Sequence, residues 1–305
     1  MDDFPGPVRW SPAVAAARRD LAVVALESSV LAQGLPIPAN READHRMRAA
    51  VERHGAFPAV VAVVRGECRV GLHDDDLERF LGRDGVVKVS ARDLGWAVAR
   101  GLDGATTVAG TLALCVTAGL EVFATGGIGG VHREPAFDES ADLLELARSP
   151  VITVCAGAKS ILDLPATLER LESYGVAVIG LGTDEFPGFF TRHTGLHLSA
   201  HTDDPADVAA AFRAHRRLGR PGAMLVVQPP PATAALDGGV VDDAVATALA
   251  EARRAGVSGA AATPFLLDAV FRATGGASLL ANLALLEANA ALAARIAVAL
   301  RELPP

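Results

Sequence analysis

The sequence contains very little lysine. Lys88 and Lys159 are the two lysines, although lysine and arginine together number 28. Arginine stays protonated and cannot form an imine, whereas lysine can lose its proton and attack a carbonyl carbon. We therefore interpret each surviving lysine as a position that arginine cannot fill. The alternative interpretation is chance survival under a compositional bias toward arginine.

Cysteine is also scarce. The three cysteines, Cys68, Cys115 and Cys155, form no Cys-x-x-Cys pair, which argues against a disulfide framework and a cysteine-based zinc site. The chain opens with Met1-Asp2-Asp3, which is acidic where the start of a secretion signal is basic. We therefore expect a cytoplasmic protein whose cysteines are ordinary core or near-surface residues.

Positive charge is in the minority overall. Aspartate and glutamate number 36, and the formal net charge is −8, which argues against partners such as a nucleic-acid polymer or an anionic membrane surface. An anionic small substrate then requires a local cluster of positive charge. The longest uncharged run, residues 104–120, has 17 residues with three glycines and four threonines. This run is too short and polar for a membrane span, and it predicts a buried strand and helix.

Strands and helices alternate along the middle of the chain. Half of the 305 residues are hydrophobic, and apolar runs, glycine turns and helical stretches follow one another between residues 106 and 180. This alternation predicts an α/β fold with a mixed or mostly parallel sheet flanked by helices. We expect an N-terminal arm at residues 1–19 and a single catalytic domain at 20–305. A hairpin is expected at 58–72, and helices at 242–255, 264–274 and 279–303.

Several common catalytic and cofactor motifs are missing. The glycines at 127, 129 and 130 follow a predicted strand, but His132 occupies the third glycine position of a dinucleotide fingerprint. Ala158-Lys159-Ser160 resembles the end of a phosphate-binding loop, yet the required glycines are absent. Gly-x-Ser-x-Gly and His-Glu-x-x-His do not occur. The usual dinucleotide, hydrolase and metalloprotease classes therefore lose support.

Polar residues at the ends of apolar strands are the remaining candidates. Glu27 follows an apolar strand, where burial would raise its pKa for acid/base work; a solvated strand end is the alternative. Thr125, the glycines after it and His132 form either an anion-binding loop or an ordinary glycine turn. Asp138 and Asp142 are four residues apart at a helix start. One of them either binds a divalent cation or serves helix capping.

Eight short motifs occur in order over residues 20–300, at 25–29 (ALESS), 88–94 (KVSARDL), 124–133 (ATGGIGGVHR), 140–143 (SADL), 156–163 (AGAKSILD), 182–187 (GTDEFP), 263–267 (TPFLL) and 281–282 (AN). Together they resemble the pseudouridine-5′-phosphate glycosidase family, which includes indigoidine synthase A-type proteins. The resemblance implies one α/β domain per subunit, a homotrimer, and chemistry at the C–C bond between a base and C1 of ribose 5-phosphate.

The resemblance also implies roles for individual residues. Lys159 matches the nucleophile that forms an imine at C1, and Glu27 matches the acid/base. Asp138 matches a ligand of Mn²⁺ or another divalent cation, and Asn282 matches a group that faces the base. The phosphate and sugar positions are matched by Lys88, Thr125, His132, Ser140 and Asp142, with Val108 offering a backbone contact.

The departures from the family pattern surround this machinery. They are a shortened loop at 134–137, Glu139 in place of an apolar residue, Ala32-Gln33 in place of Ser/Thr-His, and a missing acidic ending after Gln228. We therefore predict C-ribosylation of a non-uracil aromatic (polyketide) acceptor in antibiotic biosynthesis, as in the branch with the alnumycin C-ribosylating enzyme. Cleavage of pseudouridine 5′-phosphate to uracil and ribose 5-phosphate is the alternative. A non-catalytic sugar-phosphate-binding protein and an aldolase-type lyase are further rivals.

Overall fold

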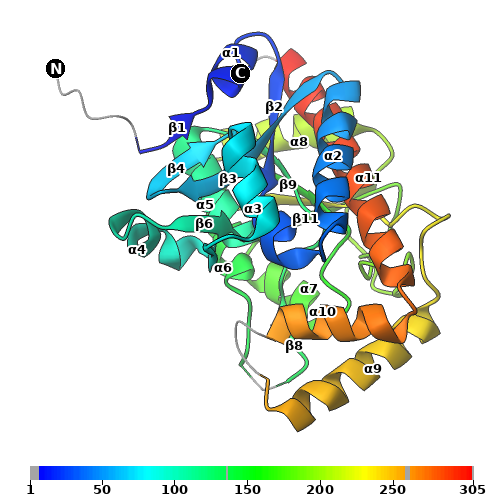
Figure 1. The fold of residues 1–305 in the computed structure, drawn as a ribbon. Helices are drawn as coiled ribbons and strands as arrows, with labels where there is room; N and C mark the ends of the chain where they lie inside the picture. The colour runs from blue at the N-terminus through cyan, green and yellow to red at the C-terminus, as the bar shows by residue number, and fades with distance from the viewer. Residues whose placement is uncertain (1–6, 135–136, 258–261, 304–305) are drawn as a thin grey trace.

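One mixed sheet organises the molecule. The computed structural model describes residues 7–134, 137–257 and 262–303. Eleven strands form the main sheet, with helices on both of its faces (Figure 1). The predicted α/β fold with a mostly parallel sheet is confirmed.

The central strands of the sheet are parallel. In spatial order the main path is β1 (Arg9–Trp10), β4 (Glu67–Val70), β3 (Ala56–Val64), β2 (Ala22–Glu27), β7 (Val122–Ala124), β9 (Ile152–Cys155), β13 (Met224–Val227), β11 (Ala177–Leu181) and β12 (His201–Thr202). From β3 to β12 every neighbouring pair is parallel. The strands β7, β9 and β13 are buried along their whole length, because helices cover both faces.

The remaining strands lie beside this path. The strand β3 pairs antiparallel with β4, which confirms the predicted hairpin. It also pairs antiparallel with β6 (Asp103–Thr106), and β6 pairs in turn with β5 (Val86–Val89). A second small sheet joins β8 (Val131–His132) to β10 (Leu162–Asp163). Part of the predicted N-terminal arm belongs to the main sheet, because β1 pairs in parallel with β4.

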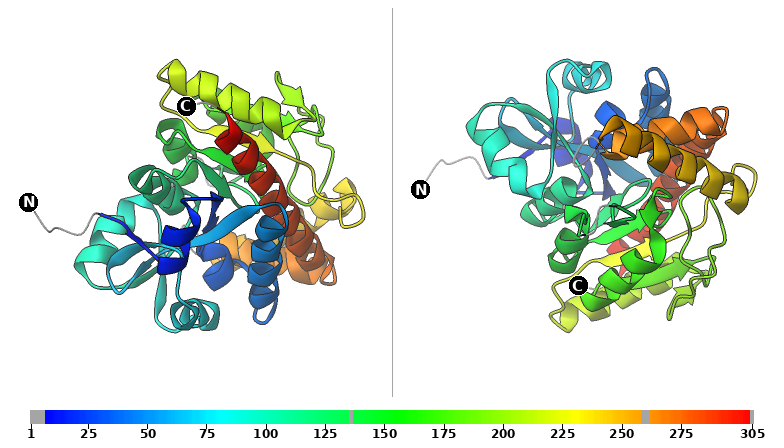
Figure 2. Two further views of the ribbon diagram at one scale, coloured as in Figure 1. Left: turned by 90° about the horizontal axis from the view of Figure 1, so that it is seen from above. Right: turned by 90° about the horizontal axis from the view of Figure 1, so that it is seen from below.

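Helices cover the two faces of the sheet (Figure 2). One face carries α2 (Ala39–Arg53), α8 (Pro205–Arg217) and α11 (Ala277–Glu302), and the other α5 (Val108–Ala118), α6 (Ala141–Arg148) and α7 (Leu164–Ser173). At the periphery lie α1 (Pro12–Ala17), the π-helix η1 (Val30–Gly34), α3 (Asp74–Gly82), the 3₁₀ turn η2 (Ala91–Asp93), α4 (Leu94–Ala99), α9 (Gly238–Ala255) and α10 (Ala262–Ala273). The three helices predicted at the end of the chain correspond to α9, α10 and α11.

The helix α11 is a core helix. It is the one helix of the described residues whose length and composition would suffice for a membrane span, but 61% of its most apolar window is buried inside the protein. It lies against α2, α8 and the strands β2, β7 and β9. The uncharged run at 104–120 forms β6 and α5, as predicted.

The fold brings several strand ends to one place. Glu27 is the last residue of β2 and pairs in register with Val61 of β3. Thr106 ends β6, and its hydroxyl donates to the Val61 carbonyl at 2.8 Å. On the other side of β2, Thr125 directly follows β7, and Lys159 lies on the loop after β9. The strand ends thus surround one region at the carboxyl edge of β2.

Candidate active site

All ten residues predicted for the site line one cleft. The cleft has two cavities, of about 580 Å³ and about 60 Å³, and both are lined by Glu27, Lys88 and Lys159. The larger cavity is also lined by Val108, His132, Asp138, Ser140 and Asp142. Thr125 and Asn282 line the smaller one. The structure thus brings these residues together, while their individual roles remain predictions.

Glu27 is a buried acid. It is only 6% exposed, so the solvated strand end considered above is wrong. Burial raises its pKa to about 7, against the opposing positive charge of Lys159, and the negative charge of Asp142 adds to the rise. Its Oε2 is buried without a hydrogen-bond partner among the described residues. Glu27 can therefore exchange a proton near neutral pH with a group that enters the cleft.

The two lysines provide the local positive charge that an anionic small substrate requires in this acidic chain. Lys88 is on β5, paired in register with Ala105, and Lys159 is on the loop after β9. Burial lowers the pKa of Lys88, and the charge of Lys159 lowers it further. The backbone N–H of Lys159 donates to the Ile128 carbonyl at 3.1 Å, which fixes the nucleophile candidate against the glycine run.

Two helix N-termini face the larger cavity. Thr107 caps α5, where its hydroxyl accepts from Gly110 N, and Ser140 caps α6, where its hydroxyl accepts from Asp142 N. Both caps line the cavity, together with Ser90, whose buried hydroxyl has no partner among the described residues. The partial positive charge at helix N-termini favours anions such as phosphate.

Asp142 holds two backbone segments together. Its Oδ1 accepts from Ala109 N at 2.9 Å and its Oδ2 from Gly129 N at 2.8 Å. The prediction that both Asp138 and Asp142 lie at a helix start is wrong for Asp138, because α6 begins at Ala141 and Asp138 lies before its cap. The Asp142 carboxylate is therefore a clamp between α5 and the glycine run, and this bonding argues against metal ligation by Asp142.

The glycine run packs tightly, and several of its N–H groups donate to protein acceptors. Ile128 N donates to Gly157 O at 3.0 Å, and Val131 N donates to the Thr167 hydroxyl at 2.9 Å. A Cβ at Gly129 would lie 2.2 Å from the Ser140 hydroxyl. Protein acceptors take these N–H groups, which therefore do not themselves bind an anion, and an anion-binding loop formed by the rest of the run stays a prediction. Close packing requires the glycine.

Asp138 is suited to hold a cation. No hydrogen bond or ion pair with a described residue engages its carboxylate, although it borders the larger cavity with His132. Burial lowers the pKa of His132, while the charge of Asp138 opposes that change. Among the described residues no three histidine, cysteine, aspartate or glutamate side chains gather at one point. A hard cation held by the Asp138 carboxylate would therefore take the rest of its shell from water and substrate oxygens.

Asn289 is a positioning residue that the sequence reasoning missed. Its side-chain amide donates to Thr125 O at 2.8 Å and to Gly126 O at 3.2 Å, while Gln228 donates to its oxygen at 2.9 Å. It lies seven residues after Asn282 on the same apolar helix. Two asparagines seven residues apart share a helix face, and this spacing is the sequence signal that could have identified Asn289.

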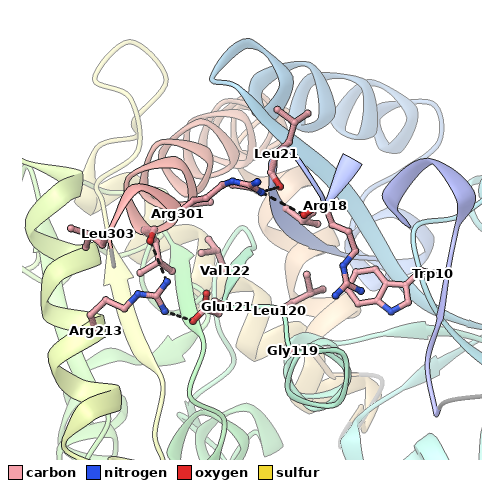
Figure 3. Close-up of a pocket in the computed structure, with 14 residues that line it drawn as sticks. Trp10, Arg18, Leu21, Gly119, Leu120, Glu121, Val122, Arg213, Arg301 and Leu303 are labelled. Atoms are coloured by element: carbon pink, nitrogen blue, oxygen red, sulfur yellow. Dashed lines mark hydrogen bonds and ion pairs between the residues drawn. The ribbon is translucent and has the colours of Figure 1, made fainter. Parts of the chain in front are cut away.

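A separate cavity of about 380 Å³ lies at the opposite ends of β2 and β7 (Figure 3). Its arginines are engaged by the protein. Arg213 donates to Glu121 and to Leu300 O at 2.8 and 3.2 Å, and Arg18 stacks 4.1 Å from the Trp10 ring. Arg301 donates to the Leu21 carbonyl at 2.7 Å. These bonds tie the end of α11 to the start of β2, and none of the ten candidate residues lines this cavity.

The sequence has close relatives. A family model described as Indigoidine synthase A like protein matches residues 13–299. A protein of Gemmatimonas aurantiaca named pseudouridine-5′-phosphate glycosidase is 64% identical over 299 residues, which cover 98% of this chain and 98% of the relative. One of the same name from Herpetosiphon aurantiacus is 54% identical, with coverage of 91% and 92%.

Solved structures share the fold over nearly the full length. The crystal structure of the prealnumycin C-glycosynthase AlnA in complex with ribulose 5-phosphate matches with a TM-score of 0.89 at 39% identity, covering 98% of each chain. An indigoidine synthase A-like protein from Thermotoga maritima matches with a TM-score of 0.89 at 32% identity, also covering 98% of each. The resemblance identified from the eight motifs is confirmed.

Proposed function

Because this chain belongs to the Indigoidine synthase A like protein family, we propose that it cleaves pseudouridine 5′-phosphate to uracil and ribose 5-phosphate, and catalyses the reverse reaction. It is an enzyme of the glycosidase and C-glycosynthase kind. One observation carries the proposal. A lysine and a buried acid with a pKa of about 7 line the same cavity, between two capped helix N-termini and an amide-lined pocket.

Uracil has more support than the polyketide acceptor that the sequence favoured. The relative at 64% identity bears the glycosidase name, whereas the C-glycosynthase is 39% identical. Two of the unusual residues have structural partners: Glu139 pairs with Arg170, and Gln228 bonds to Asn289. The shortened loop at 134–137 lies partly outside the described residues. The departures at Glu139 and Gln228 thus give a larger acceptor little support, whereas Gln33 lines the smaller cavity.

Lys159 acts as the nucleophile. Carbon is a poor leaving group, and the protonated-oxygen scheme of ordinary glycosidases does not apply to this bond. The uncharged amine of Lys159 bonds to C1 as the ring oxygen leaves, and a proton passes from the newly bonded nitrogen to that oxygen. The nitrogen lone pair then forms the C1=N bond as the base departs. Water hydrolyses this iminium, releasing ribose 5-phosphate and the free amine.

Glu27 supplies the proton for the departing base. Its carboxylic acid protonates C5 of the uracil ring, and the electron pair of the C1–C5 bond then restores the C5=C6 double bond. An acid with a pKa of about 7 is partly protonated at neutral pH and can be reprotonated after each turnover. The burial that raises the pKa of Glu27 is thus part of the chemistry.

The phosphate binds in the larger cavity. The N-terminal ends of α5 and α6 and the ammonium group of Lys88 supply positive potential there, in a chain of net charge −8. The ring-opened sugar then spans from this end of the cleft to Lys159. This placement leaves the smaller cavity, lined by Thr125 and Asn282, for the base.

Asp138 is the ligand for Mn²⁺ or another divalent cation. When bound, the cation supplies charge that neutralises phosphate and sugar oxygens. His132 shares this end of the cavity. The homotrimer implied by the resemblance, and a cytoplasmic location, also remain proposals; light scattering tests the first, against a subunit mass of 31.4 kDa.

Mass spectrometry of the products tests the function. The enzyme is incubated with Mn²⁺ and pseudouridine 5′-phosphate, and in parallel with ribose 5-phosphate, uracil and a panel of polycyclic aromatic acceptors. We expect uracil and ribose 5-phosphate from the first mixture. A ribosylated polycycle without uracil chemistry would favour the C-ribosylation alternative. Cleavage of the sugar phosphate without a base would favour an aldolase-type lyase, and binding without turnover a non-catalytic protein.

A further inference from the structure

The side chain of Gln33 has no role in the chemistry described above, yet it borders the base end of the cleft. It lines the smaller cavity and also an adjoining cavity of about 260 Å³, and Asn282 lines both as well. Gln33 belongs to the π-helix η1, a rare conformation that is frequent at functional sites. The side chain of Asn40 holds this turn, donating to Leu31 O at 3.0 Å and Leu81 O at 2.8 Å.

The orientation of the Gln33 amide is fixed by its neighbour. Its Nε2 donates to the carbonyl of Val86 at 3.4 Å, and a carbonyl can only accept. The other end of the amide must therefore be the oxygen. That Oε1 is buried and has no hydrogen-bond partner among the described residues. An unpaired buried acceptor destabilises a protein, so its retention points to a ligand donor.

The base itself shows which donor Gln33 would meet. In pseudouridine the sugar is attached at C5, and both N1–H and N3–H lie on the half of the ring away from the sugar. In uridine the sugar is attached at N1. When the two glycosidic bonds are superposed, the carbonyls and N3–H coincide, and N1–H of pseudouridine takes the place of C5–H of uridine. An acceptor at that position distinguishes the two linkages.

We propose that Gln33 is a specificity-determining residue whose Oε1 accepts a hydrogen bond from N1–H of the C5-linked base. The oxygen is the only group of Gln33 that is available. It matches N1–H of the base, because the C6–H group next to N1 needs no hydrogen-bond partner. The amide of Asn282 makes no hydrogen bond with a described residue and can offer both a donor and an acceptor. It therefore matches N3–H together with an adjacent carbonyl. This assignment rests on the proposed function and extends it to recognition of the base.

Methylated substrates test the contact. Wild-type enzyme and Gln33→Ala are assayed with the 5′-phosphates of pseudouridine, N1-methylpseudouridine and N3-methylpseudouridine. For the wild type, N1-methylation should lower kcat/KM by about tenfold to a hundredfold, the effect of leaving a buried acceptor unpaired. In Gln33→Ala the parent substrate should lose a similar factor. The N1-methyl substrate should then react nearly as fast as the parent, because the acceptor is gone and there is space for the methyl group.

The N3-methyl substrate is the matched control, because its penalty should be the same in both enzymes. An unchanged N1-methyl penalty in Gln33→Ala, or relief of the N3-methyl penalty instead, overturns the assignment. If the variant does not fold, the wild type still decides, since equal rates on the parent and N1-methyl substrates contradict the contact. If the wild type leaves pseudouridine 5′-phosphate intact, the proposed function itself is refuted. If it cleaves this substrate and the ratio of kcat/KM between the parent and N1-methyl substrates is the same in Gln33→Ala, only the assignment of Gln33 is refuted.

Discussion

At the residue scale, Glu27 links the proposed catalysis to stability. Its pKa of about 7 in the folded protein lies above the ordinary value of 4.5, because burial disfavours the charged form. The unfolded chain ionises first as the pH rises. The free energy of unfolding therefore falls between these two pH values and stays lower above them, by about 3 kcal/mol. The folded protein carries this instability to keep an acid in the cleft.

Replacing Glu27 by glutamine should expose that effect. Glu27→Gln cannot ionise, so relative to wild type its Tm should rise at about pH 8 and change little at about pH 5. Product formation should fall strongly at both pH values, because the proton donor is lost. Thermal unfolding of both proteins at the two pH values is the measurement. An equal Tm difference at both pH values would show that Glu27 does not carry the raised pKa.

Asp138 gives a second prediction at this scale. A chelator should lower turnover, and added Mn²⁺ should restore it. Asp138→Asn should require at least about tenfold more Mn²⁺ for half-maximal activity, because one charged oxygen ligand is lost. The control is Asp184→Asn, which removes a carboxylate that is 63% exposed and is not in the cleft. Activity that is indifferent to chelation would remove Asp138 from its assigned role.

At the element scale, the loops after β7 and β9 are built by close contacts. Gly157 has a φ of +83°, and a Cβ there would lie 2.0 Å from the Pro187 carbonyl oxygen. The carbonyl of Gly157, which lies two residues before Lys159, accepts a hydrogen bond from Ile128 N at 3.0 Å. The position of Lys159 therefore depends on a backbone approach that only glycine permits.

Alanine substitutions at two glycines separate the close approach from the effect of positive φ. Gly182 has a φ of +68° and open space on its side-chain side, where an added Cβ would have no heavy atom within 4 Å. Gly182→Ala should lower the free energy of unfolding by about 1–2 kcal/mol, the left-handed backbone cost alone. Gly157→Ala should lower it by about 4 kcal/mol or more, because the backbone must also shift. Equal losses in urea denaturation would contradict the importance of the close approach.

The sequence predicted elements better than contacts between them. Apolar runs and helical periodicity located the strands and the three final helices, the strand-end position singled out Glu27, and the scarcity of lysine singled out Lys159. The clamp made by Asp142 was not predictable, because its partners Ala109 and Gly129 come from other segments. The support from Asn289 was missed for the same reason. These bonds depend on tertiary packing, which a local pattern does not contain.

At the scale of the whole molecule, an acidic chain places both of its lysines in the cleft where we propose that the anionic substrate binds. Both lysines line the cleft, where Arg92 also borders the larger cavity, and other arginines carry positive charge outside it, as in the ion pair of Arg41 with Glu78. The scarcity of lysine was therefore informative about the site. The acceptor was harder to predict, because loop length and single substitutions do not by themselves describe the pocket around the base.

Borohydride trapping is the decisive experiment for an imine on Lys159. The enzyme is incubated with Mn²⁺ and ribose 5-phosphate, reduced, digested and analysed by peptide mass spectrometry. Lys88→Met serves as the control that removes the other lysine. We expect a reduced sugar-phosphate adduct on Lys159, present in the wild type and in Lys88→Met and absent in Lys159→Ala. An adduct on Lys88, or trapping that persists in Lys159→Ala, would refute the imine on Lys159.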